Sequence, residues 1–131
     1  MPSSITSLRE RYAETDQMGI VYYAHYFVWF EVARPELLRT LGRNYREMGA
    51  SGVLLPVIEA SCDYVRPARY DDEIEVRTDG HLRSPVRMEF LYQVTVKSRA
   101  ELAATGRTVH AATDRAGKPC RVPDRIREAF A

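Results

Sequence analysis

Two consecutive stretches in the middle of the chain alternate apolar and polar residues with a period of two. They cover residues 74–82 and 86–96, and the turn-forming pair Ser84 and Pro85 separates them. A period of two places the apolar residues on one face of an extended strand, and a short turn joins antiparallel neighbours. The pattern therefore predicts two antiparallel strands that share one apolar face.

Weaker strand patterns lie on both sides of this pair. We expect a short first strand in residues 4–12, and a strand in residues 58–64 that has one buried and one wetter face and ends before Pro67. The last strand is expected at residues 101–113, followed by a turn at residues 114–119. Close packing or a bulge is expected where this strand carries small residues, namely Ala103, Ala104 and Gly106.

A helical period replaces the strand period between residues 24 and 41. Apolar residues recur there at three- and four-residue steps, the spacing of one helical face: Tyr26, Phe30, Ala33, Leu37 and Leu41. Pro35 lies inside this pattern, so we expect a kink, or a new helix beginning near Arg34. Gly42 is expected to stop the helix.

The order of the predicted elements indicates the fold class. Residues 43–52 predict a short helical turn and loop before the strands resume, and residues 122–130 predict a short terminal helix. A sheet with one apolar face needs a cover, and the long helix is the only predicted element large enough. We expect one α+β domain over residues 1–131, with an antiparallel β-sheet wrapped around one long central α-helix. Its exposed sheet edges predict pairing with a second subunit.

Charge and composition argue against several classes of partner. Lys plus Arg number 19 and Asp plus Glu number 18, with the cations scattered, so a nucleic-acid partner is not expected. The most apolar run, residues 20–30, is too short for a membrane span. Residues 1–16 show no secretory signal, and a cytoplasmic location is expected. Cys62 and Cys120 form no C-x-x-C pair, which predicts buried or half-buried free thiols.

The loop before the long helix holds the strongest candidate site. It contains Asp16 and, three residues later, the flexible Gly19. The first N–H groups of a helix beginning near residues 23–24 have no internal partner and carry the positive end of the helix dipole. A carboxylate and free amides on opposite sides of a carbonyl carbon would form a minimal acyl-transfer site. The simpler alternative is that Asp16 only caps a turn or the helix.

The three histidines are weaker candidates. His25, in the first helical turn, would either transfer a proton or orient water, or be a partly buried structural residue. His81 is expected to be solvated, and His110 is expected to be a structural residue with satisfied ring nitrogens. No metal-ligand spacing such as H-x-x-x-H occurs, so no metal is expected. The G-x-S-x-G, P-loop and dinucleotide motifs are also missing, so no cofactor is expected.

One block of sequence resembles a known family signature. The block "RYAETDQMGIVYYAHYFVWFEVAR" is similar to the signature of the 4-hydroxybenzoyl-CoA thioesterase-type branch of the hotdog superfamily, close to its small bacterial acyl-CoA thioesterases. The matching positions are Arg11, Asp16, Gly19, Val21, Tyr26, Glu31, Ala33 and Arg34. The resemblance continues in "DYVRPARYDDEIEV" and "HAATDRAGKPCRVP", and thus covers nearly the whole chain.

This resemblance implies a hotdog fold, pairing of two subunits through their sheets, and often dimers of such dimers. It gives Asp16 the position of a catalytic aspartate, acting as nucleophile or as general base. Tyr23 takes the position whose backbone N–H polarises the thioester carbonyl. Many relatives have histidine at the position of Tyr23, whereas here the histidine is His25, so its role stays open.

The resemblance also implies a substrate, an acyl-CoA, whose nucleotide and pantetheine would be bound near subunit boundaries. The cations expected there are Arg66, Arg69, Lys118 and Arg121. The resulting prediction is an acyl-CoA thioesterase without metal or cofactor, forming a homodimer or homotetramer. Two alternatives remain: a hotdog hydratase or dehydratase, for which Glu31 would be the acid, and a non-catalytic acyl-CoA-binding protein.

Overall fold

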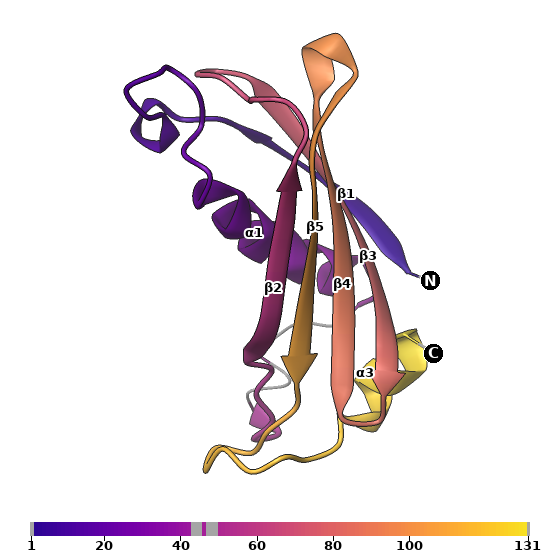
Figure 1. Cartoon of the computed structure of the whole chain (residues 1–131). Helices are drawn as coiled ribbons and strands as arrows, with labels where there is room; N and C mark the ends of the chain where they lie inside the picture. The colour runs from indigo at the N-terminus through magenta and orange to yellow at the C-terminus, as the bar shows by residue number, and fades with distance from the viewer. Residues whose placement is uncertain (1, 43–45, 47–49, 131) are drawn as a thin grey trace.

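The computed structural model describes residues 2–42, 46 and 50–130. The elements, in chain order, are β1 (Ser3–Arg9), the 3-10 turn η1 (Tyr12–Glu14), α1 (His25–Thr40), β2 (Val57–Tyr64), β3 (Glu73–Ser84), β4 (Arg87–Val96), the 3-10 turn η2 (Lys97–Arg99), β5 (Glu101–Ala111) and α3 (Asp124–Phe130). The architecture is α+β, with a five-stranded sheet in the order β1-β3-β4-β5-β2 (Figure 1). Every pair of neighbouring strands is antiparallel.

The two alternating stretches form β3 and β4, as predicted. They pair from Ile74 opposite Val96 to Ser84 opposite Arg87, so the expected turn joins them directly. The apolar residues of both strands are buried on one face and the intervening residues are more exposed. The alternation therefore reports a sheet with one covered face, since side chains of successive strand residues point to opposite sides.

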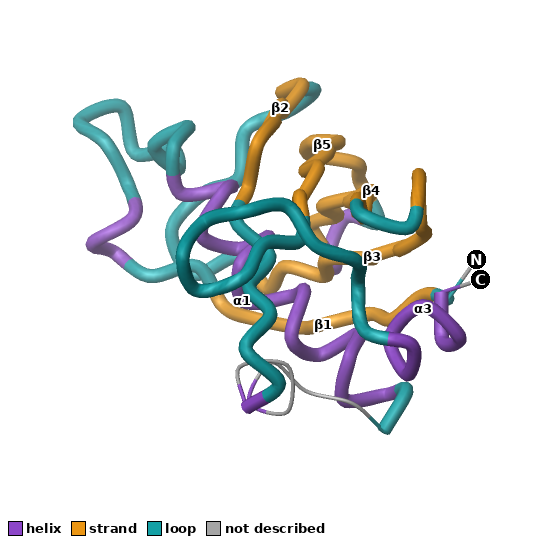
Figure 2. The backbone as a smooth tube through the Cα atoms, turned by 90° about the horizontal axis from the view of Figure 1, so that it is seen from below, coloured by secondary structure: helices purple, strands orange, loops and turns teal. Residues whose placement is uncertain are grey.

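The covered face packs against α1, which lies on the concave side of the curved sheet (Figure 2). Phe30 of α1 stacks on Tyr92 of β4 with ring centroids 4.2 Å apart. A Cβ atom at Gly106 would lie 2.3 Å from Cζ of Phe30, so only glycine fits there. Ala103 is an extra residue where the register of β5 shifts against β4. The small residues of this strand therefore mark both close packing and a bulge.

The terminal helix α3 also covers the sheet. Phe130 packs edge-on against Phe90 of β4, and a Cβ atom at Gly80 of β3 would lie 2.6 Å from the Phe130 ring. Ile126 and Phe130 are both buried. The expectation that the long helix alone covers the sheet is therefore wrong at the end of the sheet where α3 lies.

The long helix runs without a break through Pro35. The expected new helix near Arg34 is therefore wrong. Pro35 lacks an N–H and forfeits one hydrogen bond, but the helix is held on both sides of it by the buried residues Ala33 and Leu37. Gly42 follows the helix with φ 72°, the left-handed conformation of a helix stop. Most of the helical turn and loop predicted at 43–52 lies outside the described residues.

The strand predicted at residues 58–64 forms as β2, but its predicted buried face is not observed within one chain. Among the strands of the described residues, β2 pairs only with β5 and is an edge of the sheet. Its residues are exposed except for the half-buried Cys62. Ile58 and Tyr64 are 45% and 46% exposed. An alternating pattern identifies the strand, but it does not say whether the chain itself supplies the cover.

Candidate active site

The loop before α1 is a small closed hairpin. Thr15 bridges Val21, the N–H of Asp16 donates to the carbonyl of Ile20 at 2.8 Å, and the N–H of Tyr22 donates to the carbonyl of Glu14 at 2.8 Å. Gly19 takes φ 78° at its tip, a conformation that side chains with a Cβ atom rarely adopt. The backbone of Asp16 is therefore fixed relative to the start of α1.

Glu14 ties this hairpin to the helix. Its carboxylate is buried and accepts hydrogen bonds from the indole Nε1–H of Trp29 at 3.0 Å and from the N–H of Arg11 at 2.8 Å. Sequence reasoning missed this residue, because an acid in a polar cluster before a helix carries no signal that separates a buried clamp from a solvated charge. In the described sequence, the one signal that could have drawn attention to Glu14 is its position two residues before Asp16.

The segment after β2 holds the hairpin from the opposite side. Val21 donates its N–H to the carbonyl of Ala68 at 2.9 Å, and Ile20 bridges Arg69. The hydroxyl of the buried Tyr26 accepts from the N–H of Ala68 at 3.4 Å. Burial raises the pKa of Tyr26 above its ordinary value. Two chain segments far apart in sequence therefore frame one hollow.

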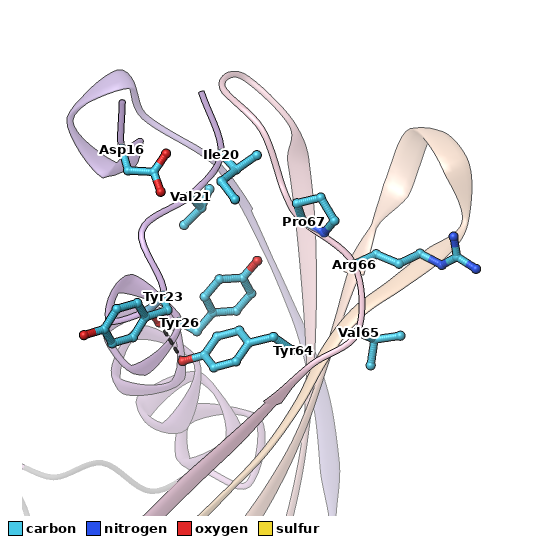
Figure 3. A pocket seen from close by; sticks show the side chains of 9 residues that line it. All are labelled: Asp16, Ile20, Val21, Tyr23, Tyr26, Tyr64, Val65, Arg66 and Pro67. Carbon is cyan, nitrogen blue, oxygen red and sulfur yellow. Dashed lines mark hydrogen bonds between the residues drawn. The ribbon is translucent and has the colours of Figure 1, made fainter. Parts of the chain in front are cut away.

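This hollow is a cavity of about 350 Å³ with a mainly apolar lining (Figure 3). The described residues that line it are Asp16, Ile20, Val21, Tyr23, Tyr26, Tyr64, Val65, Arg66 and Pro67. Asp16 and Tyr23 come from the hairpin and helix start, and Tyr64 to Pro67 come from the end of β2 (Figure 3). Asp16 and Tyr23, singled out from the sequence, thus lie on the same pocket.

The Asp16 carboxylate is half engaged. Its Oδ1 accepts the N–H of Met18 at 2.8 Å, which is the turn-capping bond of the simpler interpretation. Among the described residues, none donates a hydrogen bond to Oδ2. One oxygen therefore orients the side chain, while the other is available to a ligand.

Two backbone amides are free where α1 begins. Within the described part of the chain, the N–H groups of Tyr23 and Ala24 donate to no acceptor, and no side chain caps the helix. The next amide, that of His25, donates to the carbonyl of Tyr22 at 3.0 Å. The predicted unpaired donors are present, and they carry the positive end of the helix dipole. Of these two residues, Tyr23 lines the pocket together with Asp16. A free carboxylate oxygen and a free amide on residues of one apolar pocket can act on a carbonyl group from two sides.

Of the other predicted site residues, some line the pocket and others do not. The described residues lining the pocket do not include His25, whose ring meets Tyr22 edge-on at 6.1 Å. Arg66 lines the pocket and pairs with Glu101 at 3.7 Å. Arg69 contributes its backbone bridge to Ile20, and its side chain is exposed.

Lys118 and Arg121 lie far from this pocket in the same chain. Both are exposed in the loop after β5, at the end of the sheet where β2 begins, whereas the pocket lies where β2 ends (Figure 1). The length of β2 alone separates these ends by roughly 20 Å. The structure of one chain therefore does not bring these two cations to Asp16.

The other histidines have local partners. His110 is buried, with Nδ1 2.9 Å from the carbonyl oxygen of Leu55 and Nε2 2.9 Å from the hydroxyl of Thr108, so the predicted structural role is confirmed. Its pKa is lowered to about 4, chiefly by burial. His81 is half-buried beside Glu89 at 3.0 Å, so the prediction that it is simply solvated is wrong.

Both cysteines are free and half-buried, as predicted. Burial raises the pKa of the Cys62 thiol. Among residues 2–42, 46 and 50–130, no group of three metal-ligating side chains comes together. In the same residues, no helix has both the length and the apolar character needed to cross a membrane.

Comparison with known proteins identifies relatives over nearly the whole chain. The family model of the thioesterase-like superfamily matches residues 11–130. The structure of a DHNA-CoA thioesterase from Staphylococcus aureus is similar with a TM-score of 0.92 and 34% identity, over 99% of this chain and 89% of that one. This likeness extends to every element that frames the pocket.

Two bacterial relatives match over shorter stretches. YneP of Bacillus subtilis is 46% identical over 78 residues, which are 60% of this chain and 56% of YneP. The acyl-CoA thioester hydrolase YbgC of Escherichia coli is 36% identical over 72 residues, which are 55% of this chain and 54% of YbgC. The matches thus span about half the length of these two relatives.

Proposed function

The chain belongs to the thioesterase-like superfamily, and from this membership we propose that it hydrolyses acyl-CoA thioesters to the free carboxylic acid and CoA. The relatives named for this chemistry support the reaction class. The observation that carries the proposal is the pairing, on one pocket, of the free Oδ2 of Asp16 with the free N–H of Tyr23.

Asp16 performs the central step in one of two ways. As a nucleophile, its carboxylate attacks the thioester carbon, the C–S bond breaks, CoA leaves as a thiolate that takes up a proton, and water then hydrolyses the acyl anhydride. As a general base, it takes a proton from the water that attacks the same carbon, the C–S bond then breaks, and the CoA thiolate takes up that proton. In both routes the N–H of Tyr23 donates to the carbonyl oxygen as it gains negative charge.

Three further residues support the reaction in different ways. Gly19 permits the turn that places Asp16 beside the pocket. Arg66 is the cation placed to meet the CoA portion, because it lies on the pocket itself. His25, two residues after Tyr23, acts through solvent if it transfers a proton, since it is not among the described pocket residues.

The fold is of the hotdog type, with α1 as its central helix, and two chains pair through β2. The exposed apolar side chains on this edge support the pairing, since an open strand edge with apolar neighbours favours association. They include Val57, Ile58, Tyr64 and Val65. Lys118 and Arg121 contact CoA only when a second subunit supplies them, because within one chain they lie at the far end of the sheet.

The experiment that tests this function is a thiol-release assay on a panel of acyl-CoA substrates that includes benzoyl-CoA and butyryl-CoA. Release of free CoA from these saturated or aromatic thioesters is expected for a thioesterase. A hydratase or dehydratase would release none from them and would act on an enoyl-CoA or a hydroxyacyl-CoA. A non-catalytic binding protein would bind them without any release.

A further inference from the structure

Tyr64 joins the two sides of the pocket by one hydrogen bond. It is the last residue of β2, where it pairs with Ala104 of β5. Its hydroxyl reaches across to α1 and donates to the carbonyl oxygen of Tyr23 at 2.9 Å (Figure 3). Its ring meets Tyr26 edge-on with centroids 5.1 Å apart. An edge strand therefore holds Tyr23, which lies two residues before the first residue of α1.

The carbonyl that Tyr64 binds is otherwise weakly held. At the start of α1, the N–H of Tyr26 donates to the carbonyl of Tyr23 over 3.4 Å, near the limit of a hydrogen bond. The hydroxyl of Tyr64 is closer and is thus the stronger donor. Without it, the peptide unit after Tyr23 would depend on the long bond alone.

The peptide unit before Tyr23 is held separately. Its carbonyl, that of Tyr22, accepts the N–H of His25 at 3.0 Å. Tyr23 is therefore fixed on both sides, by His25 on one and by Tyr64 on the other. The free N–H of Tyr23 lies in the plane of the peptide unit before Tyr23, so the orientation of that unit sets its direction. The bond from Tyr64 holds the next unit, and this restrains the Cα atom of Tyr23, about which the first unit would otherwise turn.

From this arrangement we infer that Tyr64 is a positioning residue, which aims the N–H of Tyr23 at the carbonyl oxygen of the bound thioester. The inference rests on the proposed thioesterase function and deepens it. Tyr64 acts through Tyr23 and need not touch the reacting atoms. Preorganised donors stabilise a transition state because they are oriented before the charge develops. Loosening the backbone at Tyr23 therefore affects the chemical step more than substrate binding.

The surroundings of Tyr64 suit a permanent donor. Loss of surrounding solvent raises its pKa, with the neighbouring Cys62 as a further contribution in the same direction. The hydroxyl thus stays protonated at neutral pH. In one chain the residue is 46% exposed on an edge strand, and a phenylalanine keeps the ring that pairing through β2 would cover, so the loss of the hydroxyl alone should change global stability little. A positional role and a stabilising role therefore predict different results.

The test compares Tyr64→Phe with Tyr70→Phe in the thiol-release assay with benzoyl-CoA. Tyr70 is also an exposed tyrosine, does not line the pocket, and its hydroxyl bonds to no described residue. We expect Tyr64→Phe to lower kcat about tenfold, the worth of one hydrogen bond, with KM and the urea midpoint unchanged. Tyr70→Phe should change none of these. An unchanged kcat, or a rise in KM alone, would overturn the inference.

A vibrational measurement separates this inference from the proposed function. Benzoyl-CoA is bound to Asp16→Asn, with and without Tyr64→Phe, and the thioester carbonyl stretch is recorded by infrared difference spectroscopy with a ¹³C-labelled carbonyl. We expect a shift to lower frequency in Asp16→Asn that shrinks when Tyr64→Phe is added. An equal shift in both proteins would refute the positioning role. If the native chain releases no thiol, the proposed function fails, while this comparison still decides the role of Tyr64.

Discussion

The indole N–H of Trp29 donates to a carboxylate oxygen of Glu14 at 3.0 Å, fifteen residues earlier in the chain. The carbonyl of Glu14 also accepts the N–H of Tyr22, so one buried residue joins the start of the loop that carries Asp16 to the end of that loop and to α1. These hydrogen bonds attach the loop to α1. Its geometry is expected to depend on the charge and shape of Glu14.

Replacing Glu14 by glutamine should lower the free energy of unfolding by about 1–3 kcal/mol. The two carboxylate oxygens each accept one N–H, from Trp29 and from Arg11. The NH₂ group of a glutamine would replace one of these oxygens, and it would then face an N–H donor and accept no hydrogen bond from it. Urea denaturation measures the effect, with Glu31→Gln on the exposed face of α1 as the matched control, expected to stay within about 0.5 kcal/mol. Equal unfolding midpoints in the two variants would contradict the clamp.

A second prediction concerns His110 and pH. In the neutral ring, Nδ1–H donates to the carbonyl of Leu55 and Nε2 accepts from the Thr108 hydroxyl, which in turn accepts from Tyr92 at 2.7 Å. These partners satisfy both nitrogens of the neutral ring. Its pKa is lowered from 6.5 to about 4 by burial, against the opposing effect of the Leu55 bond and with the help of Arg34.

The direction of the change in stability with pH follows from how many protons the folded and unfolded chains bind. Between these pKa values the unfolded chain binds more protons than the folded chain, so stability is present above the unfolded value and is lost as pH falls towards the folded value. From pH 7 to pH 5 this histidine should cost about 2 kcal/mol of unfolding free energy. Urea denaturation at both pH values should show the loss in the native chain and a smaller loss in His110→Asn. Identical losses would argue against the neutral buried ring.

A third prediction concerns the exposed edge strand β2. If two chains pair there, Ile58→Lys places positive charges in the contact and should lower the mass measured by light scattering after size exclusion. Ile5→Lys is the matched control, because Ile5 is 65% exposed on β1, the opposite edge of the sheet. We expect the control to keep the native mass. A native chain that is already monomeric, or equal masses in both variants, would contradict pairing through β2.

Much of the fold was predictable because local patterns decide it. The period of two defined β3 and β4, and the helical period defined α1 to within one residue at each end. What the patterns did not predict was long-range: β1 pairs with β3, and β2 pairs with β5. Periodicity reports which residues share a face, but it carries no information on which strands become neighbours.

The site was predictable in part for the same reason. Asp16 and Tyr23 lie in one short segment, so the motif and the helix start locate them together. The opposite wall, with Tyr64, comes from a strand about forty residues later, and only the folded chain shows its hydroxyl against the carbonyl of Tyr23. Pro35 shows the opposite limit, since a local rule predicted a kink or a new helix near Arg34, and α1 continues through this residue as one helix.

The assignment of Asp16 as the catalytic carboxylate is tested most directly by Asp16→Asn, which keeps the turn-capping oxygen but removes the charge. The measurement is kcat for thiol release from benzoyl-CoA, together with the Kd for the same thioester by calorimetry. We predict a kcat lower by about 10²–10⁴-fold, the usual contribution of a general base, with Kd nearly unchanged. A kcat equal to that of the native chain would contradict the assignment.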